Sequence, residues 1–252
     1  MGKSWYNTGF DSIAAEKDRL ARLGGPDRLW IKEGSPTRSI VLLDDEPFVI
    51  YEHNWRANGT WRNWTTCLAD TSDVLPCCDK LTPRNRSWTG FFTCIDCTER
   101  KDAKGNSYQY GLMLLPTKLQ TAELLKKRKE SKGSLVGAAF NVTRITADDP
   151  NVGNDWEYDR PADMEKLFKV AQYKGKKIVD LYKEASENPD VLKRLQYTFA
   201  LSLTEGKIAP KLVPFNYASI LAPKSVTEVR QLLGSIVAEG GPANKPDDEI
   251  PF

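Results

Sequence analysis

The distribution of cysteine constrains this chain more than any other feature. All five cysteines of the 252 residues fall between Cys67 and Cys97, and the only histidine, His53, lies shortly before them. In a reducing cytosol, such a cluster is typical of a metal site rather than of a disulfide framework. Thiolates and imidazole are the preferred ligands of tetrahedral zinc, and a Cys3His set would close a polar loop that could not fold alone. We therefore expect one Zn2+ ion per chain.

The ligand set stays open at this point. His53, Cys67 and the adjacent pair Cys77 and Cys78 have a suggestive spacing, but neighbouring cysteines point in different directions and seldom bind one ion together. The run Cys94-Ile95-Asp96-Cys97 has the Cys-x-x-Cys form and could supply a substitute ligand. It also falls in a strand-like stretch, so its cysteines could equally be small strand residues.

Composition limits the class of protein. With 40% hydrophobic residues the chain can bury a real core, and its length fits one large domain or two small ones. The net charge of +2 means that any nucleic-acid surface must come from local clustering of Lys and Arg. No apolar run reaches the length of a membrane span, and Met1–Tyr6 lack an apolar signal core. We expect a cytosolic protein that makes no membrane contacts.

No catalytic constellation stands out, so we expect a protein that is not an enzyme. The chain has a single histidine and contains neither a complete Walker-type phosphate loop nor a Gly-x-Ser-x-Gly motif. Two acidic clusters, Asp44-Asp45-Glu46 and Asp148-Asp149, could suggest a two-metal nuclease, but they lack partners at an evident spacing. We interpret both as acidic turn residues.

Strand-like runs dominate the chain up to Thr146. Leu119–Ser131 reads instead as a helix, with Leu119, Ala122 and Leu125 facing inward and Lys126-Lys127-Arg128-Lys129 facing outward. Five strands with a helix between the fourth and the fifth predict an α+β chain with a mainly β core, built on a closed five-stranded barrel of the OB-fold type. An open α+β sheet would produce the same pattern. The expected strands are Arg38–Tyr51, Thr60–Leu68, Ser87–Thr98, Ser107–Leu115 and Leu135–Thr146.

The remaining part reads as mostly helical. Asp163 is a helix cap, Pro189 begins another helix, and Ser225-Val226-Thr227-Glu228 is a capping box. We expect the helix after the capping box to pack against the barrel, with docking to another copy as the alternative. The expected organisation is an N-terminal arm or helix (1–30), an OB-fold core with a cysteine-rich insertion (31–160), a helical C-terminal extension (161–238) and a flexible acidic tail (239–252).

Tryptophan and arginine alternate in the middle of the chain. Unpaired bases stack on aromatic rings at roughly 1–3 kcal/mol each, while arginine contacts phosphates without reading sequence. In a strand, Arg62 and Trp64 point to one face and Trp61 to the other, so one face could bind and the other pack. Any single ring could instead belong to the core. The expected DNA contacts are Trp55, Arg56, Trp61, Arg62, Trp64, Arg84, Arg86, Phe92, Arg100, Lys101, Tyr108 and Tyr110.

The chain ends in Asp247-Asp248-Glu249-Ile250-Pro251-Phe252, after a Gly- and Pro-rich stretch. Ile250 and Phe252 could fill a small apolar pocket of a partner, Pro251 limits the entropy lost on ordering, and the carboxylates could meet a basic rim. This tip resembles the tail of bacterial single-stranded-DNA-binding proteins. An ordinary disordered acidic end is the alternative.

The chain as a whole resembles the single-stranded-DNA-binding proteins of tailed bacteriophages, in a layout similar to that of T-even phages. The resemblance implies an OB-fold with a zinc-binding insertion whose ligands would be His53, Cys67, Cys77 and Cys78. Leu75 departs from the Cys-Pro-x-Cys pattern of that family. The stretches that carry the resemblance are Ile40–Phe48, Tyr51–His53, Trp61–Leu68, Gly90–Asp96, Lys132–Ala138, Val213–Tyr217 and Leu221–Ser225.

We therefore predict a protein that coats single-stranded DNA in phage replication, recombination and repair, in the cytoplasm of the infected bacterial host. Its tip would recruit replication or recombination proteins, and copies could associate along the DNA. Two alternatives remain open. One is a transcription-modulating or protein-docking phage protein that uses the aromatic segment for a protein contact, and the other is a metal-dependent nuclease or recombination factor.

Overall fold

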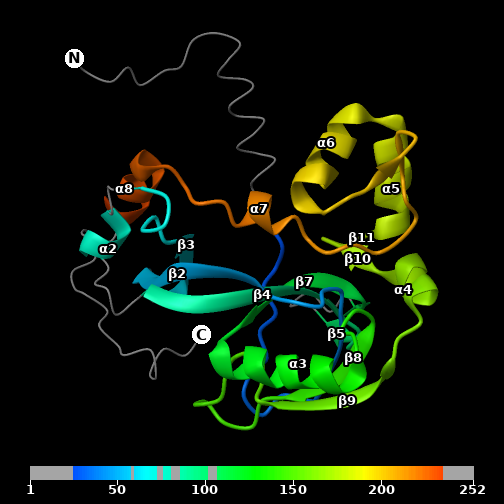
Figure 1. The fold of residues 1–252 in the computed structure, drawn as a ribbon, viewed down its shortest axis with the longest axis horizontal. Helices are drawn as coiled ribbons and strands as arrows, with labels where there is room; N and C mark the ends of the chain where they lie inside the picture. Colours follow the sequence, from blue (N-terminus) through cyan, green and yellow to red (C-terminus); the bar gives the residue numbers. More distant parts are fainter. Residues whose placement is uncertain (1–24, 58–59, 73–75, 81–85, 102–106, 235–252) are drawn as a thin grey trace.

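The computed structural model describes residues 25–57, 60–72, 76–80, 86–101 and 107–234. Over these residues the chain is α+β with a mainly β core (Figure 1). The strands are β1 (Arg38–Leu42), β2 (Phe48–Ala57), β3 (Thr60–Thr66), β4 (Arg86–Asp96), β5 (Arg100–Lys101), β6 (Ser107–Tyr108), β7 (Gly111–Thr117), β8 (Ala138–Thr143), β9 (Asp155–Pro161), β10 (Gln172–Tyr173), β11 (Lys176–Lys177), β12 (Leu203–Thr204) and β13 (Lys207–Ile208). The helices are α2 (Pro76–Lys80), α3 (Leu119–Lys132), α4 (Met164–Val170), α5 (Ile178–Glu187), α6 (Pro189–Thr198), α7 (Tyr217–Ile220) and α8 (Val226–Gly234).

Strand β4 organises the main sheet. Its whole second half pairs with β7 along one edge, while its other edge is shared between β2, along Arg86–Phe91, and β1, along Cys94–Asp96. The sheet continues in the order β11-β10-β7-β4-β1-β8-β9, and β3 pairs with β2 alone. The β2–β3 hairpin therefore branches away from the rest of the sheet at the middle of β4.

The expected closed barrel does not form among the described strands. The main sheet is open and mixed, with β9 and β11 as its outer strands and a parallel pairing between β10 and β7. Closure would require the outer strands to pair with each other. Instead, β9 extends the sheet beyond β8, and β10–β11 extends it beyond β7, and neither addition was evident from the sequence.

Two hydrophobic cores cover the two faces of the sheet. Side chains of β4, β7 and β1 alternate between them, so Phe91 and Ile95 face one core while Phe92 and Cys94 face the other. The first core packs against α4–α7, and the second against α3, β9 and the segment around Leu29. Burial on both faces explains why β4 carries apolar residues at adjacent positions, as in Phe91-Phe92 and Cys94-Ile95. It also means that the helical extension shares a core with the sheet.

The helix between β7 and β8 is confirmed, and so is Leu125 as an inward residue, but the prediction that Leu119 faces inward was wrong. Leu119 is 58% exposed, whereas Thr121 and Leu125, one turn apart, are buried. Three other helix starts are confirmed by their caps: Asp163 accepts from the Lys166 N–H, Asn188 precedes Pro189 and accepts from Asp190, and Ser225 and Glu228 bond reciprocally.

The acidic turn residues make structural contacts. Asp44 accepts hydrogen bonds from the Thr93 N–H and from the Tyr217 hydroxyl, which ties the turn after β1 to the segment at α7. Asp45 accepts from the backbone N–H of Leu135 at 2.7 Å. Asp149 accepts from backbone N–H groups of its own loop. Each of these carboxylates thus holds a loop in place by hydrogen bonds, which agrees with the interpretation of the acidic clusters as turn residues.

Candidate metal centre and adjoining groove

The β2–β3 hairpin positions the first two candidate metal ligands. His53 lies opposite Thr65 in the hairpin register, and Thr65 is two residues before Cys67. The Cys67 N–H donates to the Tyr51 carbonyl at 2.8 Å. This bond continues the β2–β3 pairing by one residue beyond the end of β3. His53 and Cys67 are 0% and 2% exposed, so imidazole and thiol are held together away from solvent.

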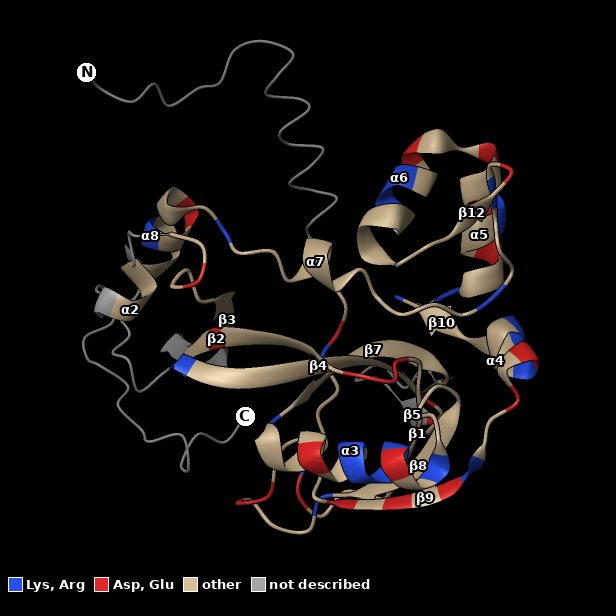
Figure 2. Ribbon diagram, in the orientation of Figure 1, with Lys and Arg blue, Asp and Glu red and all other residues tan. Residues whose placement is uncertain are grey.

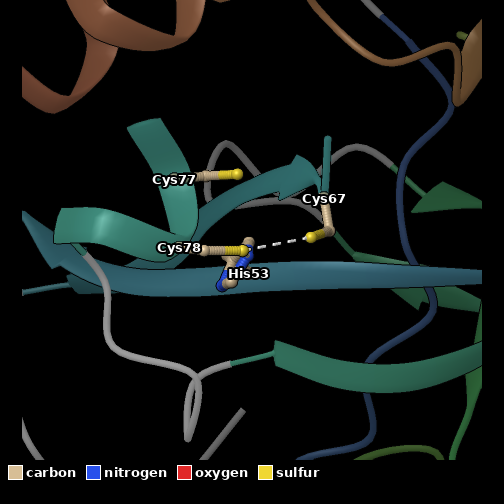
Figure 3. Close-up of side chains that lie close together, drawn as sticks. All are labelled: His53, Cys67, Cys77 and Cys78. Atoms are coloured by element: carbon tan, nitrogen blue, oxygen red, sulfur yellow. Dashed lines mark hydrogen bonds between the residues drawn. The ribbon is translucent and has the colours of Figure 1, made fainter. Parts of the chain in front are cut away.

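The short helix α2 brings Cys77 and Cys78 to the same place (Figure 3). The Cys78 Sγ lies 3.5 Å from the Cys67 Sγ and 3.6 Å from the His53 Nε2. One ligand atom from each of the four residues lies within 4.8 Å of all the others. The described residues contain no other cluster of this kind. Helical geometry lets both neighbouring cysteines face the histidine, which the sequence argument had treated as unusual.

These distances fit a zinc ion. With Zn–S near 2.3 Å and Zn–N near 2.0 Å, tetrahedral geometry places ligand atoms about 3.3–3.8 Å apart. The separations of Cys78 Sγ from Cys67 Sγ and from His53 Nε2, 3.5 and 3.6 Å, fall in that range. Three sulfurs and one imidazole nitrogen form a Cys3His donor set, which is a usual composition for a structural zinc site. The set is compatible with Zn2+ and matches the one implied by the family resemblance.

The electrostatics of the cluster favour a cation. Burial, followed by the neighbouring Cys67 and Cys77 thiols, raises the pKa of Cys78 to about 12. A metal ion would reverse this penalty, because coordination deprotonates a thiol. Arg86 adds a compensating positive charge: its Nε donates to the Cys67 Sγ at 3.3 Å while its guanidinium pairs with Asp70. A guanidinium group therefore lies directly beside one of the candidate sulfur ligands.

The two remaining cysteines do not belong to the cluster. Cys94 is buried in the core of β4, and the thiol of Cys97 donates to the Ile95 carbonyl. Burial, followed by the charge of Asp96, raises the pKa of Cys97 to about 12. Both are strand or strand-end residues, so the substitute ligand considered from the sequence is not brought to the site.

Helix α8 covers the metal centre. Val229 and Leu233 are 0% and 1% exposed and form a small hydrophobic cluster with Leu68, Cys67 and Cys77. In Figure 1, α8 and α2 lie together at the far end of the β2–β3 hairpin. The expectation that α8 packs against the barrel was therefore wrong. Its apolar face covers the cysteine-rich segment, because the β2–β3 branch leaves that segment without another cover.

A groove of about 550 Å3 lies on the β2–β3 branch, next to β7 and the segment before β1. Trp30 and Trp64 both line it, and the Trp30 ring is 42% exposed. The Arg28 guanidinium lies 4.3 Å from the centre of the Trp64 ring and makes a bidentate pair with the buried Glu52. Lys118 also lines the groove and donates to the Ser87 hydroxyl at 2.8 Å. Aromatic rings and fixed cations thus share one hollow.

Positive charge is not gathered into one broad surface. Figure 2 shows Lys and Arg interspersed with Asp and Glu along α3 and α4. The groove lining holds two cations, Arg28 and Lys118, and two acids, Asp27 and Glu52, and Asp27 also pairs with Lys174 at 3.2 Å. A negatively charged ligand would therefore be attracted by individual cations of the groove rather than by a net positive charge.

The structure places the expected DNA contacts in different surroundings. Trp64 lines the groove, while Arg86 is occupied by Cys67, Asp70 and the Tyr51 ring. The prediction that Phe92 contacts DNA was wrong. Phe92 is 1% exposed in the second core and offers no ring to a base, because β4 is covered on both faces. Tyr110 is half-buried against the first core. The structure describes only the backbone of Trp55, Arg56, Trp61, Arg62, Arg100, Lys101 and Tyr108.

Two predictions fall outside the described residues, namely Arg84 and the tail Asp247-Asp248-Glu249-Ile250-Pro251-Phe252. Conversely, sequence reasoning missed Arg28, Trp30 and Lys118. They lie far from the tryptophan-rich segment along the chain. The bridge between Arg28 and Leu114, the contacts of Arg28 with Glu52 and Trp64, and the end of β7 bring them to it. A lone aromatic beside a basic residue, as in Arg28-Leu29-Trp30, was the available signal.

Comparisons with protein-family models, curated proteins and solved structures find no match to this chain. Within the part of the chain that the structure describes, no helix has the length and apolar character needed to cross a membrane.

Proposed function

We propose that this protein binds single-stranded DNA without catalysing a reaction on it. The observation that carries the proposal is the groove, whose lining includes the exposed Trp30 together with Trp64, Arg28 and Lys118. Base stacking on an aromatic ring beside cations that contact the backbone is the usual chemistry of single-strand binding. We interpret the β-rich core, with α3 between β7 and β8, as an OB-type unit opened by added edge strands.

The metal centre supports this function structurally. His53, Cys67, Cys77 and Cys78 would hold the ion, which would fasten α2 to the branch that carries Trp64. In the hairpin register, Trp64 is separated from Cys67 by only two residues. A fixed hairpin keeps the tryptophan in place and so lowers the entropy cost of binding.

The biological setting remains part of the proposal. The family resemblance supports a role in coating DNA during phage replication, recombination and repair in the host cytoplasm. The acidic tip would then recruit replication or recombination proteins, with Ile250 and Phe252 as the apolar anchors.

A tryptophan-fluorescence titration tests the proposal. We expect oligo-dT to quench the fluorescence more strongly than a duplex of equal length, and binding to weaken as salt rises. Trp30→Ala should weaken binding by about tenfold or more, since stacking contributes roughly 1–3 kcal/mol per base. Val49→Ala, a change at another exposed apolar residue, should leave affinity unchanged. Absence of binding to oligo-dT at low salt would refute the function.

A second candidate is a protein-docking module, favoured by one observation. Phe48, Val49 and Tyr51 are 36%, 45% and 37% exposed and line a second hollow, of about 330 Å3, with Tyr217 and Leu221. Exposed apolar residues gathered in this way are typical of protein contacts. If oligo-dT does not bind, this surface becomes the leading site, and Val49→Asp should then abolish partner capture while Trp30→Ala should not.

A further inference from the structure

A buried acid in the groove is connected by hydrogen bonds to both groove cations. Glu52 is 2% exposed and accepts two bonds from the Arg28 guanidinium, at 3.2 and 2.8 Å. The same carboxylate accepts from the Thr89 hydroxyl at 3.0 Å. The Thr89 hydroxyl in turn accepts from the Lys118 Nζ at 3.3 Å. One carboxylate is thus bonded to Arg28 directly and to Lys118 through a single hydroxyl.

Strand pairing assembles this network from distant parts of the chain. Glu52 in β2 lies opposite Ser87 in β4, and Ile50 lies opposite Thr89. Residues that lie opposite each other, or two apart along a strand, project to the same face, so Glu52, Ser87 and Thr89 share one face. Lys118 follows β7 directly and donates to both hydroxyls. The positions of the two cations therefore depend on the pairing around β4.

The two members of the ion pair differ in exposure. The Arg28 side chain is 19% exposed and the Glu52 side chain only 3%. Arg28 also lies against two rings, with its guanidinium carbon 4.3 Å from the centre of Trp64 and 5.1 Å from that of Phe91. A charge buried as deeply as that of Glu52 requires close donors, because a buried charge without a partner is costly. The more accessible member of the pair is therefore the cation.

Net charge does not explain how this groove would attract a phosphate, since its lining holds two cations and two acids. The placement of the cations can explain it. Arginine has N–H donors beyond the two that Arg28 gives to Glu52, and these remain for a phosphate oxygen. A guanidinium already fixed by a bidentate pair also loses less conformational entropy when a ligand binds.

We propose that Glu52 is the positioning residue of the groove. It holds Arg28 directly, and Lys118 through Thr89, where these cations contact the phosphates of a bound single strand. Glu52 acts through the cations and makes no contact with the strand itself. This inference rests on the proposed function and adds to it the means by which a groove of balanced charge binds an anionic chain.

Two substitutions remove the same negative charge from the groove lining and so separate position from charge. Glu52→Gln removes the acid that holds the cations. Asp27→Asn removes an exposed acid that pairs with Lys174, which does not line the groove. If only net charge mattered, both variants would bind oligo-dT more tightly. We expect Asp27→Asn to bind more tightly and Glu52→Gln to bind about fivefold or more weakly, because Arg28 loses its charged bidentate partner.

Salt dependence distinguishes a positioning role from a loss of folded protein. The logarithm of the affinity for a single strand falls with the logarithm of salt concentration, with a slope of about −0.7 per phosphate contact. Loss of the Arg28 contact in Glu52→Gln should therefore reduce the steepness of this slope by about 0.7. A variant that is only partly folded would lose apparent affinity with the wild-type slope. All titrations are made well below the melting temperature of each variant.

An affinity of Glu52→Gln equal to or tighter than that of wild type, or an unchanged salt slope, would overturn the positioning role and leave strand binding intact. If Glu52→Gln does not fold, Arg28→Lys is tested instead. Lysine keeps the charge but cannot make the bidentate pair, so binding should weaken about threefold or more, and wild-type affinity would overturn the role. A wild-type protein that does not bind oligo-dT would instead overturn the proposed function.

Discussion

At the scale of single residues, Asp44 shows how a turn acid gains a tertiary role. Burial raises the pKa of Asp44 to about 6, against the opposing effect of hydrogen bonds from Thr93 and Tyr217. Its hydroxyl partner Tyr217 in turn has a raised pKa, mainly through burial. Asp44 thereby links the turn after β1 to the C-terminal segment through a carboxyl group whose charge is costly in the folded state.

This shift predicts a pH dependence of stability. The folded protein holds the Asp44 proton more tightly than the unfolded chain does. Protonated Asp44 therefore contributes its full stabilisation to the folded state below about pH 4, and this stabilisation is lost as pH rises through about 6. Asp44→Asn should remove the dependence, so the stability difference between variant and wild type should change by about 2 kcal/mol over this window. Urea denaturation at pH 4, 5 and 6.5 measures it.

Asp45→Asn is the control for that experiment. Hydrogen bonds from the Leu135 N–H and Ser134 outweigh burial and lower the pKa of Asp45, so its contribution is present at neutral pH and lost on acidification. The two variants should therefore change the pH profile in opposite directions. If the stability of wild type, Asp44→Asn and Asp45→Asn changed with pH in the same way, the two opposite pKa shifts would be contradicted.

At the scale of elements, α8 is the cover of the metal centre. Its capping box determines where the helix begins, and Val229 and Leu233 then fall on one face, against Cys67 and Cys77. The Thr66 hydroxyl adds a bond to the Leu221 carbonyl shortly before the helix. Packing and metal binding should therefore be coupled.

Leu233→Ala is expected to destabilise the protein by about 2–3 kcal/mol, since it leaves a cavity in a buried cluster. It should also weaken zinc binding, because α2 would lose the surface that holds Cys77 in place. Thermal denaturation and a zinc-competition titration measure the two effects. Arg230→Ala on the exposed side of the same helix should change stability by less than about 0.5 kcal/mol. Equal zinc affinity in both variants would contradict the coupling.

At the scale of the whole molecule, the candidate metal centre and the main sheet are stabilised by different hydrophobic clusters. The main sheet has a core on each face, whereas the described part of the cysteine-rich segment belongs to a separate small hydrophobic cluster under α8. Structural zinc contributes folding free energy directly to segments of the latter kind. Loss of the ion should therefore act locally.

We expect purified protein to contain one zinc per chain and to lose it to a chelator. Hydrogen exchange should then accelerate around α2, α8 and the β2–β3 hairpin but not in β7 and β8. Cys78→Ser should reproduce this loss, while Cys97→Ser, a change at a cysteine outside the cluster, should retain the metal. Well under one zinc per chain, or exchange that accelerates throughout the main sheet, would disprove a local structural site.

Local patterns predicted local features. The cysteine cluster with His53 predicted a candidate metal site, whose four residues followed from the family resemblance and lie together in the structure. The caps at Asp163, Pro189 and Ser225 predicted where helices begin, because each depends on residues close in the chain. The α+β class with a mainly β core could also be predicted from the sequence. In these cases the interacting groups are neighbours, or their chemistry admits few alternatives.

The tertiary structure alone decided the rest. It left the main sheet open, buried Phe92, placed α8 over the cysteines and brought Arg28 and Trp30 to Trp64. Each outcome depends on which strand edges pair and which faces are covered, and a strand pattern looks the same whether one face or two are buried. The sequence by itself therefore determined which residue types form the candidate metal site and where these helices start, while the structure selected Cys77 and Cys78 over Cys94 and Cys97. The arrangement of the sheet determined which aromatic rings remain available to a ligand.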